Sequence, residues 1–224
     1  MRAWLVLLTA ILEFVEASPA WLQSDILNRP ARVIEEAAPA ASAAVLQAPA
    51  PLPADADADA KINNSAGVTV EVLPAPYVQV GEKMAVHVSA RKAGYLVLVD
   101  VDSEGKLSQI YPNMITLLDS KGVDANANFV TPEKPVTVPG DSAKGNFEFV
   151  AVPPVGVGMI VAILSDNPLQ IVDLPDVPAV LAGQSGAADF VRENAKSLNV
   201  VSAAEGGRIR NPKWSITAKF YGIR

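Results

Sequence analysis

Cysteine is absent from this sequence of 224 residues, and histidine occurs once, at His87. The lack of cysteine excludes disulfide bonds, thiolate metal sites, cysteine nucleophiles and a lipid-modified N-terminal cysteine. One histidine without cysteine leaves too few ligands for a typical zinc site. Such a chain has to gain its stability from the packing of its side chains alone.

An excess of basic residues is also missing. The sequence has 18 Lys and Arg against 24 Asp and Glu, which gives a formal net charge of −6. Phosphate binding needs a basic face, so this balance argues against nucleic acid as a partner. Aromatic residues make up only 6% of the chain, which is little for the aromatic-lined cleft of a glycosidase.

Residues 1–20 have the pattern of a secretory signal peptide. Arg2 supplies a basic start, and the apolar run Ala3 to Leu12 is too short to span a bilayer as a stable anchor. Small or tolerated residues follow at two candidate cleavage sites, which end at Ala17 and Ala20. We therefore expect export to the periplasm or the extracellular space, with no stable transmembrane span after cleavage. An uncleaved N-terminal anchor or a short helix is the alternative.

Residues 21–66 have a different composition. From Ala37 to Ala60 the chain consists largely of Ala, Pro and Asp, with few large apolar residues and no period. A segment of this kind cannot bury enough apolar surface to offset the entropy lost on ordering. Pro residues keep the chain extended, and Asp55, Asp57 and Asp59 repel one another. We predict a disordered Ala/Pro-rich linker ahead of one domain at residues 67–224.

Short strand patterns fill that domain. Alternation predicts strands at Val68–Leu73, Met84–Ser89 and Phe147–Val152, and a half-exposed strand at Trp214–Tyr221. The continuously apolar Gly158–Ser165 indicates a central strand, and Ala187–Leu198 has the apolar spacing of a helix. The pattern predicts a mainly β fold, an antiparallel β-sandwich with one late α-helix.

The stretch Gly94 to Asn113 indicates a hairpin. Tyr95 to Val99 is apolar on both faces, so it is expected to be a central strand. Asp102 to Gly105 consists of residues that favour a turn. On the return strand, Lys106 to Tyr111, Leu107 and Ile110 are out of phase with strict alternation, and a bulge would reconcile them. Pro112 lacks an N–H and ends the ladder.

The turn of this hairpin offers a calcium alternative. Asp100, Asp102, Glu104 and Gly105 stand at the first, third, fifth and sixth positions of an EF-hand loop. The twelfth position is Tyr111 instead of the bidentate Glu, and the flanks have strand patterns instead of helical ones. A solvated turn is therefore the preferred interpretation, and we predict no metal and no cofactor.

Catalytic constellations are incomplete. Gly140-Asp141-Ser142 is similar to the nucleophile region of a trypsin-like peptidase, but the flanking glycines are absent and His87 lies in the middle of a predicted strand. Asp100 and Asp102 are two apart, so both carboxylates can project to one face and serve as an acid and base pair; turn solvation is the simpler explanation. We predict no catalytic residue and no enzymatic activity.

The aromatic residues allow two interpretations. Tyr77, Tyr95, Tyr111 and Trp214 can either pack in the core or line a ligand surface, and packing is the preferred interpretation. If a site exists, we expect it at Tyr111, Pro112 and Asn113, where a strand ends and a loop begins.

The order of these motifs resembles a known family. The series Gly94-Tyr95-Leu96, then Asp102-Ser103-Glu104-Gly105, then Tyr111-Pro112-Asn113 is similar to the core signature of domain-of-unknown-function family 4384, and the resemblance runs roughly from Val68 to Tyr221. Members of this bacterial family often accompany peptidase or kinase domains or follow a signal peptide alone. The resemblance implies the last arrangement and brings no activity or catalytic residues.

These observations favour a non-catalytic exported accessory or binding module that recognises a protein or an envelope component. A carboxylate-based hydrolase of the cell envelope and a purely structural envelope protein are the alternatives.

Overall fold

The computed structural model describes residues 51–53, 64–119, 122–124, 126–140, 147–195 and 213–224. The predicted signal peptide at 1–20 and most of the predicted linker at 21–66 lie outside these residues, as do Asp141 and Ser142. Within the described ranges, no helix is long and apolar enough to cross a membrane.

The larger sheet has six strands and is built around a continuously apolar strand. Its order is β2 (Tyr77–Val78), β12 (Trp214–Ile223), β11 (Gly156–Ser165), β4 (Gly94–Val101) and β5 (Leu107–Tyr111), and β8 (Phe129–Val130) also pairs with β4. The β2–β12 pair is parallel, and β4, β5, β8, β11 and β12 pair antiparallel. The central position of β11 explains why its sequence shows no polar alternation.

The smaller sheet has four strands. Its order is β1 (Thr69–Leu73), β3 (Lys83–Ser89) and β10 (Phe149–Val150), and β9 (Val136–Val138) also pairs with β3. All of these pairs are antiparallel. Two two-residue strands, β6 (Leu118–Asp119) and β7 (Gly122–Val123), form a separate hairpin. The helices described are α2 (Met114–Leu117) and α3 (Ser185–Ala195).

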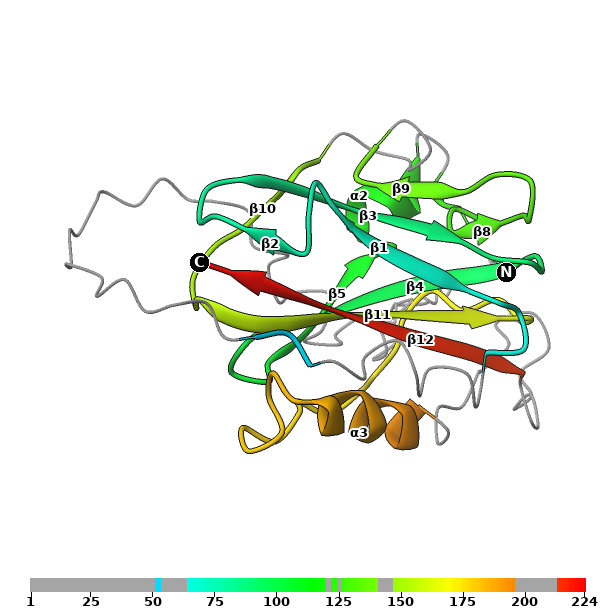
Figure 1. Cartoon of the computed structure of the whole chain (residues 1–224). Coiled ribbons are helices and arrows are strands. Elements are labelled where there is room, and N and C mark those ends of the chain that lie inside the picture. Colours follow the sequence, from blue (N-terminus) through cyan, green and yellow to red (C-terminus); the bar gives the residue numbers. More distant parts are fainter. Residues whose placement is uncertain (1–50, 54–63, 120–121, 125, 141–146, 196–212) are drawn as a thin grey trace, which may run out of the picture.

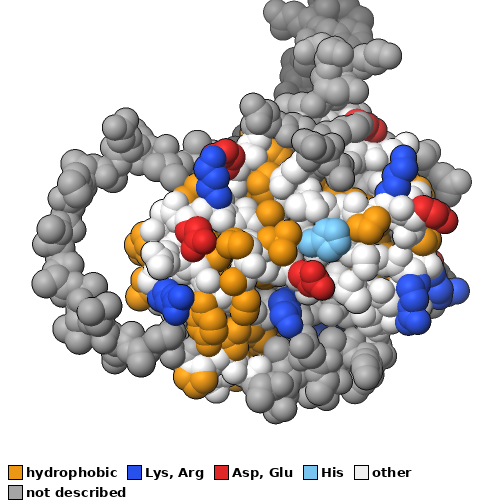
Figure 2. Space-filling view, turned by 45° about the horizontal axis from the view of Figure 1, so that its top comes forward, with side chains coloured by type: hydrophobic (Ala, Val, Ile, Leu, Met, Phe, Trp, Pro, Cys, Tyr) orange, Lys and Arg blue, Asp and Glu red, His pale blue; other side chains and the backbone are white. Residues whose placement is uncertain are grey.

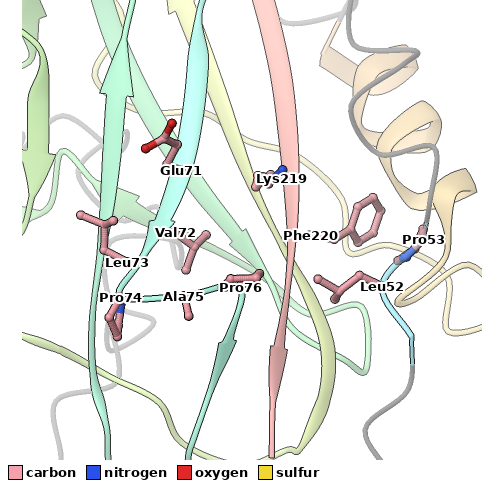
Figure 3. Close-up of a pocket in the computed structure, with 10 residues that line it drawn as sticks. All are labelled: Leu52, Pro53, Glu71, Val72, Leu73, Pro74, Ala75, Pro76, Lys219 and Phe220. Atoms are coloured by element: carbon pink, nitrogen blue, oxygen red, sulfur yellow. The ribbon is translucent and has the colours of Figure 1, made fainter.

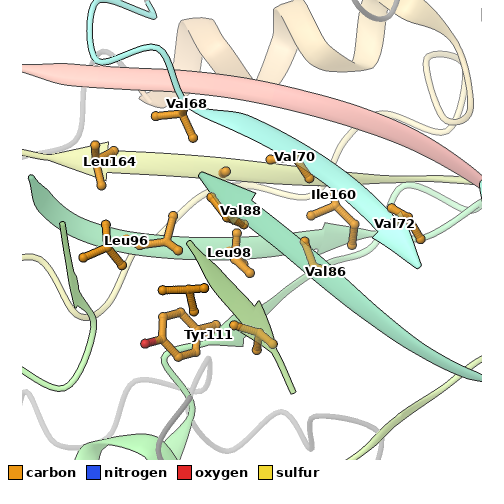
Figure 4. Close-up of a cluster of buried hydrophobic side chains, with 14 of the residues drawn as sticks. Val68, Val70, Val72, Val86, Val88, Leu96, Leu98, Tyr111, Ile160 and Leu164 are labelled. Atoms are coloured by element: carbon orange, nitrogen blue, oxygen red, sulfur yellow. The ribbon is translucent and has the colours of Figure 1, made fainter. Parts of the chain in front are cut away.

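The two sheets pack face to face over what we call the first core. Strand residues of alternate parity supply it, because neighbouring side chains of a strand point to opposite faces. Val70 and Val72 come from β1, Val86 and Val88 from β3, and Leu96 and Leu98 meet them from β4 (Figure 4). This arrangement confirms the predicted β-sandwich.

A second core covers the other face of the larger sheet. Figure 1 shows α3 lying across β11 and β12 on the side away from the smaller sheet. Val97 and Val99 of β4 and Ile163 of β11 pack there against Val191 of α3 and the segment that precedes the helix. The larger sheet is therefore buried on both faces.

Three predicted elements differ in the structure. Trp214–Tyr221 was expected to be half exposed, but β12 is buried along most of its length. The second core covers the face of Ile216 and Phe220, and on the opposite face Tyr221 packs in the first core. The strand predicted at Phe147–Val152 is reduced to β10, where only Phe149 and Val150 pair with β3. The helix predicted at Ala187–Leu198 starts earlier, at Ser185, and is described to Ala195; residues 196–198 lie outside the described part of the chain.

Candidate functional site

The β4–β5 hairpin carries the predicted bulge. Leu98 lies opposite Tyr111, and the next residue, Val99, lies opposite Gln109, so Ile110 has no partner across the ladder. The bulge lets Leu107 lie in the second core while Ile110, which is out of phase with it, packs against the first core.

Asp102 organises the hairpin turn instead of facing solvent. Its side chain is 8% exposed, and its Oδ1 accepts the backbone N–H groups of Glu104 and Lys106, each at 2.9 Å. Gly105 follows with a φ of +89°, and a Cβ there would lie 2.2 Å from the carbonyl oxygen of Val177. The turn therefore requires glycine at this position, and the Asp102 carboxylate is engaged within it.

Asp100, which was also considered as a calcium ligand or a catalytic carboxylate, accepts the Tyr221 hydroxyl at 2.8 Å. The ring of Tyr221 reaches it across β11, where Gly158 lies opposite Tyr221 and a Cβ at Gly158 would come within 2.7 Å of the ring. Among the described residues, no group of three or more His, Asp or Glu is arranged to hold a metal ion.

The predicted binding residues at the end of β5 have structural contacts. The Tyr111 side chain is 2% exposed in the first core, and its hydroxyl donates to the carbonyl oxygen of Ala127 at 3.2 Å. Burial raises the pKa of the Tyr111 hydroxyl to about 12. Asn113 Oδ1 accepts the backbone N–H of Thr116 at 2.8 Å and so caps α2.

Pro112, between them, is buried. Binding at Tyr111, Pro112 and Asn113 stays a prediction, and these contacts favour a structural role.

The other aromatic candidates lie apart from one another. Tyr95 donates to Asn126 Oδ1 at 3.0 Å and packs edge-on against Phe129, and Trp214 packs against the second core. Only Tyr77 lies close to a cleft, because its neighbours Ala75 and Pro76 line one.

His87 lies within β3, on the outward face of the smaller sheet, where its Nδ1 is 3.0 Å from Thr137 Oγ1. Figure 2 brings this side of the molecule forward. Hydrophobic side chains and charged side chains of both signs surround the histidine there, so neither sign of charge dominates around it. The contact between His87 and Thr137 links β3 and β9, and it favours a structural role for the histidine.

The described residues form an open cleft of about 460 Å³ between the edges of the two sheets. One wall is β1 and the loop after it, and the other is β12; β1 has a strand partner on one side only, and β2 pairs with β12 only at Gly222 and Ile223. Figure 3 shows these walls and the segment that closes one end. The lining residues are Leu52, Pro53, Glu71, Val72, Leu73, Pro74, Ala75, Pro76, Lys219 and Phe220.

Charge and apolar surface are separated along the cleft. Glu71 and Lys219 stand at one end, on facing strands, and the prolines and Leu52 stand at the other (Figure 3). A mostly apolar lining with a few polar groups is typical of binding clefts.

Leu52 and Pro53 enter the cleft from the predicted linker. The backbone N–H of Leu52 donates to the Tyr77 hydroxyl at 3.1 Å, and the Leu52 side chain packs against the second core. The composition of residues 21–66 gave no reason to expect a docked segment. The one signal was Leu52 itself, a large apolar residue between two prolines.

The last residues of the predicted linker are also held by the domain. Asn64 Oδ1 accepts the N–H of Val68 and its Nδ2 donates to the Val68 carbonyl oxygen, both at 2.7 Å. The Ala66 N–H donates to Ser215 Oγ at 2.9 Å. The chain is therefore anchored to the sheets on both sides of residues 54–63.

A family model described as Domain of unknown function (DUF4384) matches residues 77–168. The resemblance predicted from the hairpin is thus confirmed over these residues, which run from β2 past the end of β11. No curated protein and no solved structure matches the chain.

Proposed function

We propose that this protein is an exported, non-catalytic accessory module. The starting point is the match of residues 77–168 to the DUF4384 family of domains of unknown function. In this proposal the module recognises an extended segment of a protein or of an envelope component, and the segment lies in the cleft between β1 and β12.

The cleft carries this proposal because it runs between two sheet edges. An extended segment placed beside a sheet edge gains main-chain hydrogen bonds, and the side chains around it decide which sequence fits. The exposed Leu73 and Pro74 on one wall and the half-buried Ala75 at its base supply apolar contact without a steric barrier. Glu71 and Lys219 at one end give an extended ligand a direction.

The carboxylates that a hydrolase would use have other contacts. Asp100 accepts the Tyr221 hydroxyl, and Asp102 holds the hairpin turn through two backbone N–H groups. No feature of the described residues favours the hydrolase alternative over binding.

A selection from a displayed library of random peptides tests the proposal. The bait is the full chain, and the counter-selection uses Ala75→Trp, which places an indole in the cleft. Met114→Trp is the matched control, because Met114 is 43% exposed and follows the alternative site at Tyr111, Pro112 and Asn113.

Peptides that bind the wild-type chain and Met114→Trp but lose binding to Ala75→Trp by at least about tenfold are the expected result. Enriched peptides that bind all three chains equally, or no enriched peptide at all, would overturn the proposed site.

A further inference from the structure

The segment Pro51–Pro53 lies at one end of the cleft and is held there by contacts of the kind that a bound peptide would make. Leu52 donates its backbone N–H to a side chain of the domain, the Tyr77 hydroxyl. Its side chain is half-buried against the second core, beside Phe220. Pro53 is half-buried and lines the cleft, whereas Pro51 is exposed. One apolar anchor and one backbone hydrogen bond therefore fix the segment.

The chemistry of this segment matches that of its surroundings. Proline holds the backbone extended before binding, so less entropy is lost when such a segment docks. Extended proline-containing segments dock in grooves lined by aromatic side chains. Here Tyr77 and Phe220 provide the aromatic rings, and Pro74 and Pro76 lie on the facing wall.

We propose that the end of the cleft beside Tyr77 and Phe220 is selective for an extended leucine flanked by prolines, and that Pro51–Pro53 of the chain itself is its resident ligand. This inference rests on the proposed function, since it names the ligand class of the same cleft. The segment joins the domain through residues 54–63, and Asn64 is hydrogen-bonded to Val68. A connection of this length spans at most roughly 35 Å.

A resident ligand of this kind occupies the end of the cleft beside Tyr77 and Phe220. A ligand joined to its site through a short connection is present at an effective concentration on the order of millimolar. A segment whose own dissociation constant is about a tenth of that value weakens the apparent affinity of a competing peptide about tenfold. A partner with the same Pro-Leu-Pro chemistry therefore has to displace the chain's own segment.

Binding of a labelled peptide to full-length variants tests this inference. The probe is a fluorescent peptide with the sequence of residues 48–54, APAPLPA, and the readout is its anisotropy. Leu52→Ser frees the cleft of its anchor. We expect this variant to bind the probe about tenfold more tightly than the wild-type chain does. The double variant Leu52→Ser with Ala75→Trp and a probe with serine in place of leucine should both lose binding.

The outcomes separate this inference from the proposed function. Equal affinity of the probe for wild type and Leu52→Ser overturns the resident segment. No binding of the probe to Leu52→Ser overturns the Pro-Leu-Pro selectivity. In either case the library selection still tests the cleft itself. Peptides of another sequence that bind the wild-type chain and lose binding to Ala75→Trp would support the cleft as a binding site.

Discussion

The β4–β5 hairpin lies at one edge of the six-stranded sheet, and the cleft lies beside β12 toward the other edge. The hairpin falls within residues 77–168, which the family model matches, whereas every residue that lines the cleft falls outside them. In the hairpin, Asp100, Asp102 and the Tyr111 hydroxyl make hydrogen bonds within the domain. In the cleft, Glu71, Leu73 and Pro74 are exposed.

The difference favours a scaffold role for the most recognisable stretch of this chain. Side chains that bond to their own domain fix a geometry, and exposed side chains beside a sheet edge are available to a second molecule. Tyr221 connects the two regions, since it lies on β12 and its hydroxyl reaches Asp100 on β4. Substitutions in the hairpin should therefore change stability, and substitutions in the cleft should change binding.

The largest effect is expected from Leu98→Ala. Leu98 is fully buried in the first core, and truncation leaves a cavity that the two sheets cannot close. The free energy of unfolding should fall by about 3 kcal/mol, as measured by chemical denaturation. Val80→Ala is the control, because Val80 is 46% exposed and its truncation should cost less than about 0.5 kcal/mol. Equal effects of the two substitutions would contradict the scaffold role.

A pH-dependent loss of stability should come from Tyr111. The folded-state pKa of about 12 lies above the ordinary value of 10.0, so the folded state retains a proton that the unfolded state has lost. The stabilisation is fully present below pH 10 and is lost as the pH rises toward 12. Between pH 9 and 11.5 the wild type should lose about 2 kcal/mol more unfolding free energy than Tyr111→Phe. Parallel curves for the two chains would exclude this cause.

Gly158→Ala should weaken the contact between the two regions. The new Cβ would meet the Tyr221 ring at 2.7 Å and displace the hydroxyl from Asp100. Overpacking of this kind costs on the order of 1 to 2 kcal/mol. In a Tyr221→Ala background the ring is gone, so the same substitution should cost much less. A double-mutant cycle measures the difference, and additive costs would show that the ring contact is unimportant.

The smallest effect on stability is expected from Ala75→Trp. Ala75 lies half-buried in the open cleft, so an indole there meets little steric resistance. Thermal unfolding should show a change in unfolding free energy within about 0.5 kcal/mol, although peptide binding is lost. A large loss of stability would place Ala75 in the scaffold and remove the contrast between the two regions.

The sequence allowed the hairpin to be predicted in detail because its signals are local. Turn chemistry at Asp102 and Gly105 and the phase of Leu107 against Ile110 specify a turn and a bulge without knowledge of the rest of the chain. The prediction that β12 is half exposed was wrong because its polar face is also covered, with Tyr221 in the first core and Ser215 bonded to the Ala66 N–H. The alternation of Trp214 with Ser215 does not reveal these contacts.

The cleft was missed for a related reason. It is assembled from three segments that are far apart in the sequence, and Leu52 belongs to a stretch whose average composition predicts disorder. A composition argument sums over a window, so a single anchored leucine does not change its result. For Tyr111, packing was the preferred interpretation and a binding site the alternative, because a strand ends there; its hydroxyl donates to the carbonyl oxygen of Ala127 inside the domain.

Photocrosslinking compares the two regions most directly. A peptide from the library selection, with a photoreactive leucine analogue, is irradiated on the full chain, and the modified residues are identified by mass spectrometry. We predict crosslinks to residues 71–76 and to Lys219 and Phe220, which line the cleft. Crosslinks that instead concentrate at Tyr111, Pro112 and Asn113 would contradict the division into a scaffold hairpin and a binding cleft.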